Sequence, residues 1–130
     1  MYNAAILERF QNLQNAGMVT GAEAVGQVGS LSSGEMIKVY CRVERGVITE
    51  AKFKTLGGVY TLVVSDVLCD LIKNQTIDHA LAIQAEDIVM ALGGLPEDKW
   101  PIADLAHAVI ASLVDDYQKK LARAKLNQKK

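Results

Sequence analysis

The sequence lacks several features that would place it quickly in a class of protein. No apolar run approaches the length of about 18 residues that a membrane-spanning helix needs, so no membrane association is expected. The formal net charge of −1 gives no electrostatic reason to expect nucleic acid as a partner. The first ten residues, MYNAAILERF, have no basic start followed by an unbroken apolar block, so no signal peptide is expected.

Cysteine is also scarce. The chain contains only Cys41 and Cys69, which do not form a close-spaced pair. This pattern predicts no disulfide framework and favours the cytoplasm, a reducing compartment. Cys41 falls at an inward-facing position of a predicted strand and Cys69 lies in a mostly apolar helical run. Both thiols are therefore predicted to pack in the core rather than to react.

Catalytic and metal-binding motifs are missing as well. His79 and His107 are far apart, and neither has a cysteine or carboxylate nearby at the spacing of metal ligands. His107 flanks an apolar helical stripe, which predicts a partly buried structural role. Asp115 and Asp116 are adjacent on a predicted helix and point in different directions, so they make a poor catalytic pair. The residues alone predict a protein that is not an enzyme.

The chain does contain clear periodic patterns in its first half. Its 130 residues suffice for one domain with a core. Apolar residues at helical spacing predict a helix from Tyr2 to Leu13, with Gly17 placed to stop it. Residues 25–28 are predicted as an edge strand. Residues 36–44 and 47–54 alternate apolar and polar side chains around a Glu-Arg-Gly turn, which predicts a hairpin with one packed and one wet face.

Helical patterns fill the second half. A helix is predicted from Val59 to about residue 72, short helices at 78–83 and 86–92, and a long helix over 102–121. Asp98 is the candidate N-cap of the long helix, and Pro101 suits its first turn. The basic end, about residues 121–130, is predicted to be a solvated helix end that is mobile. Strands grouped together and followed by helices predict one α+β domain over 1–130, a small antiparallel sheet with helices on one face.

Three stretches together resemble a known family. The stretches are RFQNLQNAG, SSGEMIKVYCRVERGVITEAKFKTLGG and LPEDKWPIADL. In order and spacing they are similar to the IscU/NifU N-terminal family of iron–sulfur cluster assembly scaffolds. The resemblance runs through nearly the whole chain and implies a three-stranded antiparallel sheet with helices packed on it. It also implies protein partners such as a cysteine desulfurase or other assembly factors.

The resemblance implies a ligand site that this chain has lost. The family holds a nascent cluster, or zinc, with three cysteines and an acidic or histidine residue. Those cysteines fall on Ser33, Gly58 and Ile102, the aspartate on Glu35, and the histidine on Pro101. Only Glu35 retains a side chain that suits a ligand, because soft thiolates hold such clusters. No metal ion and no cofactor are therefore expected, and the Leu-Gly-Gly corner is expected to keep glycine for its backbone bend.

The LPEDK stretch resembles the family's segment for a chaperone of the Hsp70 type. Leu95, Pro96 and Lys99 match that segment, whereas Glu97 and Asp98 introduce acidic side chains that oppose docking into an apolar pocket. The single tryptophan follows directly, and it is either a core residue or an exposed anchor for a partner. The candidate partner-binding residues are Leu95, Pro96, Lys99 and Trp100.

Three hypotheses for function follow. The first is a non-enzymatic accessory or interaction protein of iron–sulfur cluster assembly that does not itself hold a cluster. The second is a genuine cluster or metal carrier with non-standard ligands, such as Glu35 with His107, Cys69 or a partner's thiol. The third is a small-ligand binder that uses the vacated pocket, predicted to be lined by Gly57, Gly58, Trp100 and Ile102.

Overall fold

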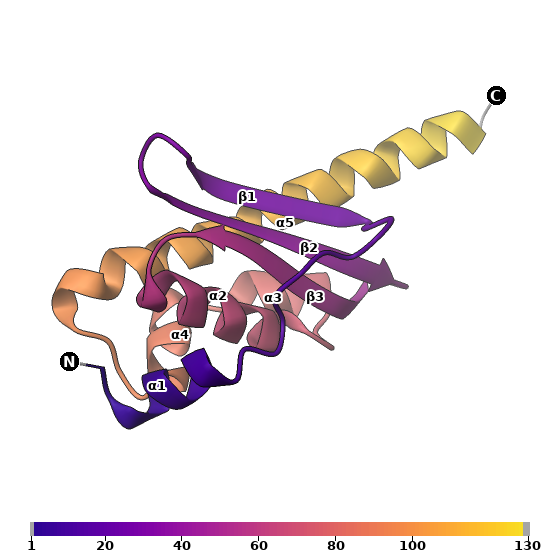
Figure 1. Ribbon diagram of the computed structural model, residues 1–130. Coiled ribbons are helices and arrows are strands. Elements are labelled where there is room, and N and C mark those ends of the chain that lie inside the picture. The colour runs from indigo at the N-terminus through magenta and orange to yellow at the C-terminus, as the bar shows by residue number, and fades with distance from the viewer. Residues whose placement is uncertain (1, 129–130) are drawn as a thin grey trace.

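The structure is a computed structural model that describes residues 2–128. One helix precedes three strands, and helices make up the rest of the chain (Figure 1). The elements are α1 (Ala4–Gln11), β1 (Ala24–Ser30), β2 (Glu35–Glu44), β3 (Val47–Leu56), α2 (Val59–Ile72), α3 (Ile77–Ala82), α4 (Ala85–Ala91), the 3-10 turn η1 (Glu97–Lys99) and α5 (Trp100–Gln128).

The three strands form one antiparallel sheet in the order β1-β2-β3. The predicted hairpin and edge strand are both confirmed. Arg45 and Gly46 turn the chain between β2 and β3, and both have a positive φ, 54° and 77°. Such φ values suit a two-residue hairpin turn that matches the twist of the strands. Along β2, Ile37, Val39 and Cys41 are fully buried, as the alternating pattern predicts.

A bulge changes the pattern of β3 from the one that strict alternation predicts. Arg42 pairs with Glu50 and Val43 pairs with Ile48, so Thr49 has no opposite residue. The extra residue in β3 shifts by one residue the positions whose side chains point toward the core. Ile48 is therefore buried, although its place in the alternation assigns it to the more polar set. Beyond the bulge, Ala51 and Phe53 are buried as the alternation predicts.

Helices cover one face of the sheet, which confirms the α+β class (Figure 1). Helix α2 packs over β3, and α5 packs along β1. The core lies between these helices and the inward residues of the strands. The other face of β2 and β3 carries polar side chains, among them Lys38 directly opposite Lys54.

Helix α5 also covers the free edge of β1. The Asp116 carboxylate accepts a hydrogen bond from the Val25 main-chain N–H at 2.7 Å, and the Ser112 hydroxyl accepts one from Gln27 N–H at 3.1 Å. The approach is close because Gly26 has no side chain. A Cβ at Gly26 would lie 2.7 Å from the main-chain nitrogen of Leu113. The edge strand is thus satisfied by side chains of α5 instead of another strand.

A buried carboxylate fixes the N-terminal segment to α2. Asp66 is fully buried and accepts hydrogen bonds from the Arg9 guanidinium at 2.7 Å and from the Gln14 and Asn15 main-chain N–H groups at 3.0 and 2.9 Å. At the outer edge of β3, the Asn15 main-chain oxygen accepts a hydrogen bond from the Phe53 N–H, and the Gly17 N–H donates one to the Phe53 oxygen, both at 2.8 Å. The segment that follows α1 is therefore held in place by polar contacts. No motif in the sequence predicts this role for Asp66.

Several predicted helix boundaries need correction. Helix α1 begins at Ala4 and ends at Gln11, before the predicted end at Leu13 and well before Gly17, because the chain then runs alongside β3. Asp98 lies inside the 3-10 turn η1 and is not the N-cap of α5. Pro101 does lie in the first turn of α5, as predicted. The expected mobile tail is helical and exposed through Gln128, and its last two residues lie outside the described part of the chain.

Within residues 2–128, none of the helices combines the length and the apolar character that crossing a bilayer requires.

Candidate functional site

An open cleft lies at one end of the sheet, where four elements meet. β2 begins there at Glu35, α2 begins after Gly58, and η1 leads into α5 at Ile102. The cleft has a volume of about 610 Å³, which falls within the range of small-molecule sites.

The structure brings three of the predicted ligand positions to this cleft. Glu35, Gly58 and Ile102 all line it, although they come from three separate parts of the chain. Ser33 is not among the lining residues. Its hydroxyl lies 2.9 Å from the main-chain oxygen of Ser30 and 3.0 Å from that of Glu35, so it is engaged within the β1–β2 loop. Of these four positions, only Glu35 offers the cleft a side chain that suits a metal.

The two glycines of the corner have different roles. Gly57 has φ +150°, and a Cβ there would lie 2.5–2.9 Å from side-chain atoms of Thr61, which is buried. Gly58 has φ −89°, an ordinary value, and a Cβ there would meet nothing within 4 Å. Only Gly57 needs glycine for the bend. The expectation that both glycines serve the bend is wrong for Gly58, where the structure has room for a side chain.

Two tyrosine rings and a lysine form one wall of the cleft. The rings of Tyr2 and Tyr60 are tilted by 57° with their centroids 5.1 Å apart, and the ammonium group of Lys99 lies 5.5 Å from the Tyr60 centroid. Aromatic rings contribute large apolar contact areas, and the cation is attracted to the face of the ring. Neither tyrosine belongs to a predicted site, although Tyr60 lies only two residues after the glycine corner.

The candidate partner-binding segment divides between the cleft and the core. Pro96 and Lys99 line the cleft. Leu95 and Trp100 are partly buried and pack against the core, and the Trp100 indole N–H donates a hydrogen bond to the Leu95 carbonyl at 3.2 Å. Trp100 therefore packs mainly as a core residue and closes the turn. The lining of the cleft also differs from the lining predicted for the vacated pocket, since neither Gly57 nor Trp100 is among the residues lining this cleft.

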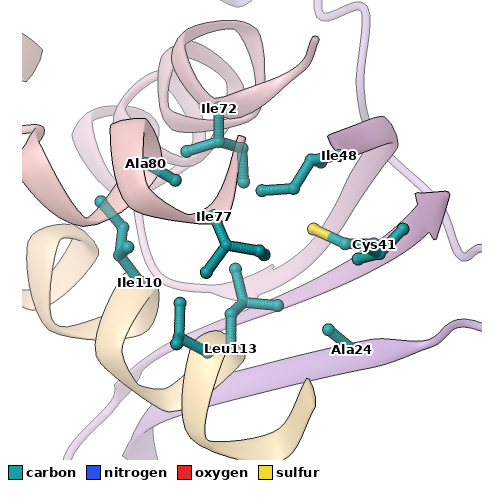
Figure 2. A pocket seen from close by; sticks show the side chains of 10 residues that line it. Ala24, Cys41, Ile48, Ile72, Ile77, Ala80, Ile110 and Leu113 are labelled. Carbon is teal, nitrogen blue, oxygen red and sulfur yellow. The ribbon is translucent and has the colours of Figure 1, made fainter. Parts of the chain in front are cut away.

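Both cysteines lie inside the protein, away from the cleft. Figure 2 shows Cys41 among apolar side chains, at a cavity of about 10 Å³ between the sheet and the helices. This volume suits roughly one water at most, and an apolar lining keeps such a space dry. Burial raises the pKa of the Cys41 thiol to about 12 and also raises the pKa of Cys69. The prediction that both thiols serve core packing is confirmed.

The non-standard ligands proposed from the sequence are not gathered at one point. Glu35 lines the cleft, whereas Cys69 is fully buried in α2 and His107 is partly buried farther along α5. In the part of the chain that the structure describes, no group of three or more His, Cys, Asp or Glu side chains is arranged to hold a metal ion.

Comparisons with known proteins agree with this architecture. The family model of the NifU-like N terminal domain matches residues 1–124. The iron–sulfur cluster assembly scaffold protein IscU 1 of Archaeoglobus fulgidus is 32% identical over 120 residues, which cover 92% of this chain and 78% of that protein. The scaffold protein IscU of Aquifex aeolicus is 33% identical over 124 residues, which cover 94% and 79%.

A solved structure shows the same fold. The N-terminal NifU-like protein of Brucella abortus superposes with a TM-score of 0.65 at 21% identity, covering 91% of this chain and 94% of that one. The sequence matches span most of the chain and most of the length of the two scaffold relatives. Three of the positions that the resemblance assigns to the family's ligands, Glu35, Gly58 and Ile102, line one cleft. The chain belongs to the family of the NifU-like N-terminal domain.

Proposed function

We propose that this protein is a non-enzymatic accessory or interaction protein of iron–sulfur cluster assembly that does not itself hold a cluster. The observation that carries the proposal is the composition of the cleft. Gly58 and Ile102 line it without any ligating side chain, and Ser33 uses its hydroxyl within its own loop. A cluster is held by thiolates, and this cleft has none of its own.

The chain's own cysteines do not replace the missing thiolates. Cys41 and Cys69 are both fully buried, and burial raises the pKa of each thiol, which favours the uncharged form. Only a thiolate ligates iron well. Because their thiols are unpaired, we also propose the cytoplasm, a reducing compartment, as the place of action.

The proposed partners are proteins of cluster assembly, such as a cysteine desulfurase. Pro96 and Lys99 are available at the cleft, next to the exposed Glu97 and Asp98. This acidic pair opposes docking into an apolar peptide groove of an Hsp70-type chaperone. We therefore expect Pro96 and Lys99 to contribute to partner contacts, and Leu95 and Trp100 to support the turn that presents them.

Anaerobic reconstitution with iron and sulfide tests the proposal. The wild-type chain is expected to retain neither visible absorption of a cluster nor stoichiometric iron after desalting. The matched comparison is the triple variant Ser33→Cys/Gly58→Cys/Ile102→Cys, which is expected to gain both signals. A Cβ at Gly58 would meet nothing within 4 Å. Stoichiometric iron retained by the wild-type chain would show that it is a carrier and would overturn the proposal.

A second candidate function is small-ligand binding in the cleft. It is favoured by the volume of about 610 Å³ and by the paired rings of Tyr2 and Tyr60. A thermal-shift screen of aromatic and anionic metabolites tests it, with Tyr60→Ala as the control that removes one ring. Hits that raise the melting temperature of the wild type but not of the variant support this function. A screen without hits argues against it.

A further inference from the structure

Within residues 2–128, the outer face of α5 is exposed and has no partner. Seven of its exposed residues follow one another at spacings of three and four, so they lie on one side of the helix. They are Asp104, Ala108, Ala111, Asp115, Gln118, Ala122 and Lys125. At about 100° per residue this face is about 100° wide. The opposite side of α5 packs on the sheet through residues such as Val109 and Leu113.

The charges of α5 are separated along its length. Residues 100–116 contain three aspartates and no lysine or arginine, whereas residues 117–128 contain four basic residues and no acid. The helix macrodipole favours such an order only within the first and last turns. Lys119 and Lys120 lie more than two turns before Gln128, so the macrodipole does not account for them. The outer face carries the same polarity, with Asp104 near one end and Lys125 near the other.

We propose that this face docks antiparallel against α5 of a second copy of the same chain. An antiparallel pair with its twofold axis near residue 115 places Asp104 of each copy opposite Lys125 of the other. The same axis relates Ala108 to Ala122 and Ala111 to Gln118. On this face, the charge near each end therefore meets an opposite charge, and the two helix dipoles also oppose each other. This charge complementarity of the face with its own reverse argues for a second copy as the occupant.

The centre and the ends of the face are compatible with this pairing. At the axis the two Asp115 side chains come together, and each is already paired with Lys119 of its own chain at 2.9 Å. The small side chains of Ala108 and Ala122 allow the helices to approach closely. Leu126 is 63% exposed in the single chain. Near the end of the pair it would lie beside Asp104 of the second copy and lose contact with water.

Sedimentation equilibrium of the full chain at low salt tests the proposal. We expect a dimer that becomes populated as the protein concentration approaches about 1 mM, the level at which even a weak complex of roughly −4 kcal/mol is detected. Its dissociation constant should rise with ionic strength, because exposed charge pairs are screened. A chain that stays monomeric at about 1 mM and low salt overturns the proposal.

Charge exchange on the same face makes the test specific. Asp104→Lys alone and Lys125→Glu alone should each raise the dissociation constant about tenfold, since two attractive pairs per dimer become repulsive. The double variant Asp104→Lys/Lys125→Glu should restore the affinity, and so should an equimolar mixture of the two single variants. Glu44→Lys and Lys54→Glu are controls, because they make the same charge changes at exposed positions on the sheet.

Comparison with the controls also shows which result would contradict the antiparallel pairing of the two α5 helices. If the single variants on α5 weaken the dimer no more than the two sheet controls do, the contact lies elsewhere. The same conclusion follows if the double variant remains as weak as the single ones. Both positions are exposed on a helix surface, so circular dichroism is expected to show the same fold for all variants.

Discussion

The two glycines at residues 57 and 58 allow a sharp test of how the corner beside the cleft is built. Changing Gly57 to alanine forces an L residue to adopt φ +150° and brings its Cβ to 2.5–2.9 Å from the buried Thr61 side chain. The backbone strain costs about 1–3 kcal/mol, and the steric overlap adds about 1–3 kcal/mol. We expect Gly57→Ala to lower the free energy of unfolding by roughly 2–6 kcal/mol.

The matched variant Gly58→Ala adds the same methyl group one residue later. Its Cβ meets nothing within 4 Å, and φ −89° is ordinary. Alanine reduces the entropy of the unfolded chain by about 0.4–1 kcal/mol, and it is a poorer N-cap for α2 than glycine by a similar amount. We expect a change in the free energy of unfolding within about 0.5 kcal/mol of zero.

Urea unfolding followed by circular dichroism measures both variants, and equal slopes with denaturant show that their transitions are comparable. The reasoning is refuted if Gly57→Ala and Gly58→Ala have the same stability. It is also refuted if Gly58→Ala lowers the free energy of unfolding more than Gly57→Ala does. The corner would then require glycine at residue 58, the position that corresponds to a family ligand.

Three other predictions concern charges and thiols. Burial opposes ionisation of Asp70, but hydrogen bonds from Arg9 and Asn15 outweigh it and hold the pKa of Asp70 below the ordinary value of 3.8. The contribution of ionised Asp70 to stability is therefore present above that value and is lost as the pH falls through the folded pKa. The free energy of unfolding, measured against pH, should fall more steeply in acid for the wild type than for Asp70→Asn. Lys54→Glu should raise the free energy of unfolding by about 0.2–1 kcal/mol, because Lys38 lies directly opposite on β2 and like charges at opposite positions are unfavourable. In the same urea assay, the double variant Lys38→Glu/Lys54→Glu should lose that gain. Iodoacetamide should leave Cys41 and Cys69 unlabelled in the native protein at pH 8, because burial keeps these thiols protonated. Mass spectrometry should show that both are labelled in urea. Rapid labelling of Cys41 in the native protein would contradict its placement in the core.

The main elements of the fold could be predicted because their patterns are local. The alternation around Ile37 and Val39 and the helical spacing through Val109 each identify an element without information from distant residues. The bulge at Thr49 could not be predicted in this way, since it depends on which residues of β2 and β3 pair across the sheet. Strict alternation therefore assigned Ile48 to the wrong set.

The candidate site was only partly predictable from the sequence. The resemblance identified Glu35, Gly58 and Ile102, and the structure brings all three to one cleft. The wall formed by Tyr2 and Tyr60 was missed, because the two residues are far apart in sequence and no motif links them. The buried contact of Asp66 with Arg9 was missed for the same reason, although an aspartate within a long apolar helix is an unusual feature that invites a search for its partner.

The edges of the sheet limit how another protein can bind to this one. Asp116 and Ser112 occupy the main-chain donors of Val25 and Gln27 on one side, and the segment at residues 15–17 pairs with Phe53 on the other. An incoming peptide strand would have to displace these groups before it could add to the sheet. Recognition of this protein is therefore expected to depend on side-chain surfaces, and the same protection opposes the edge-to-edge association that leads to fibrils.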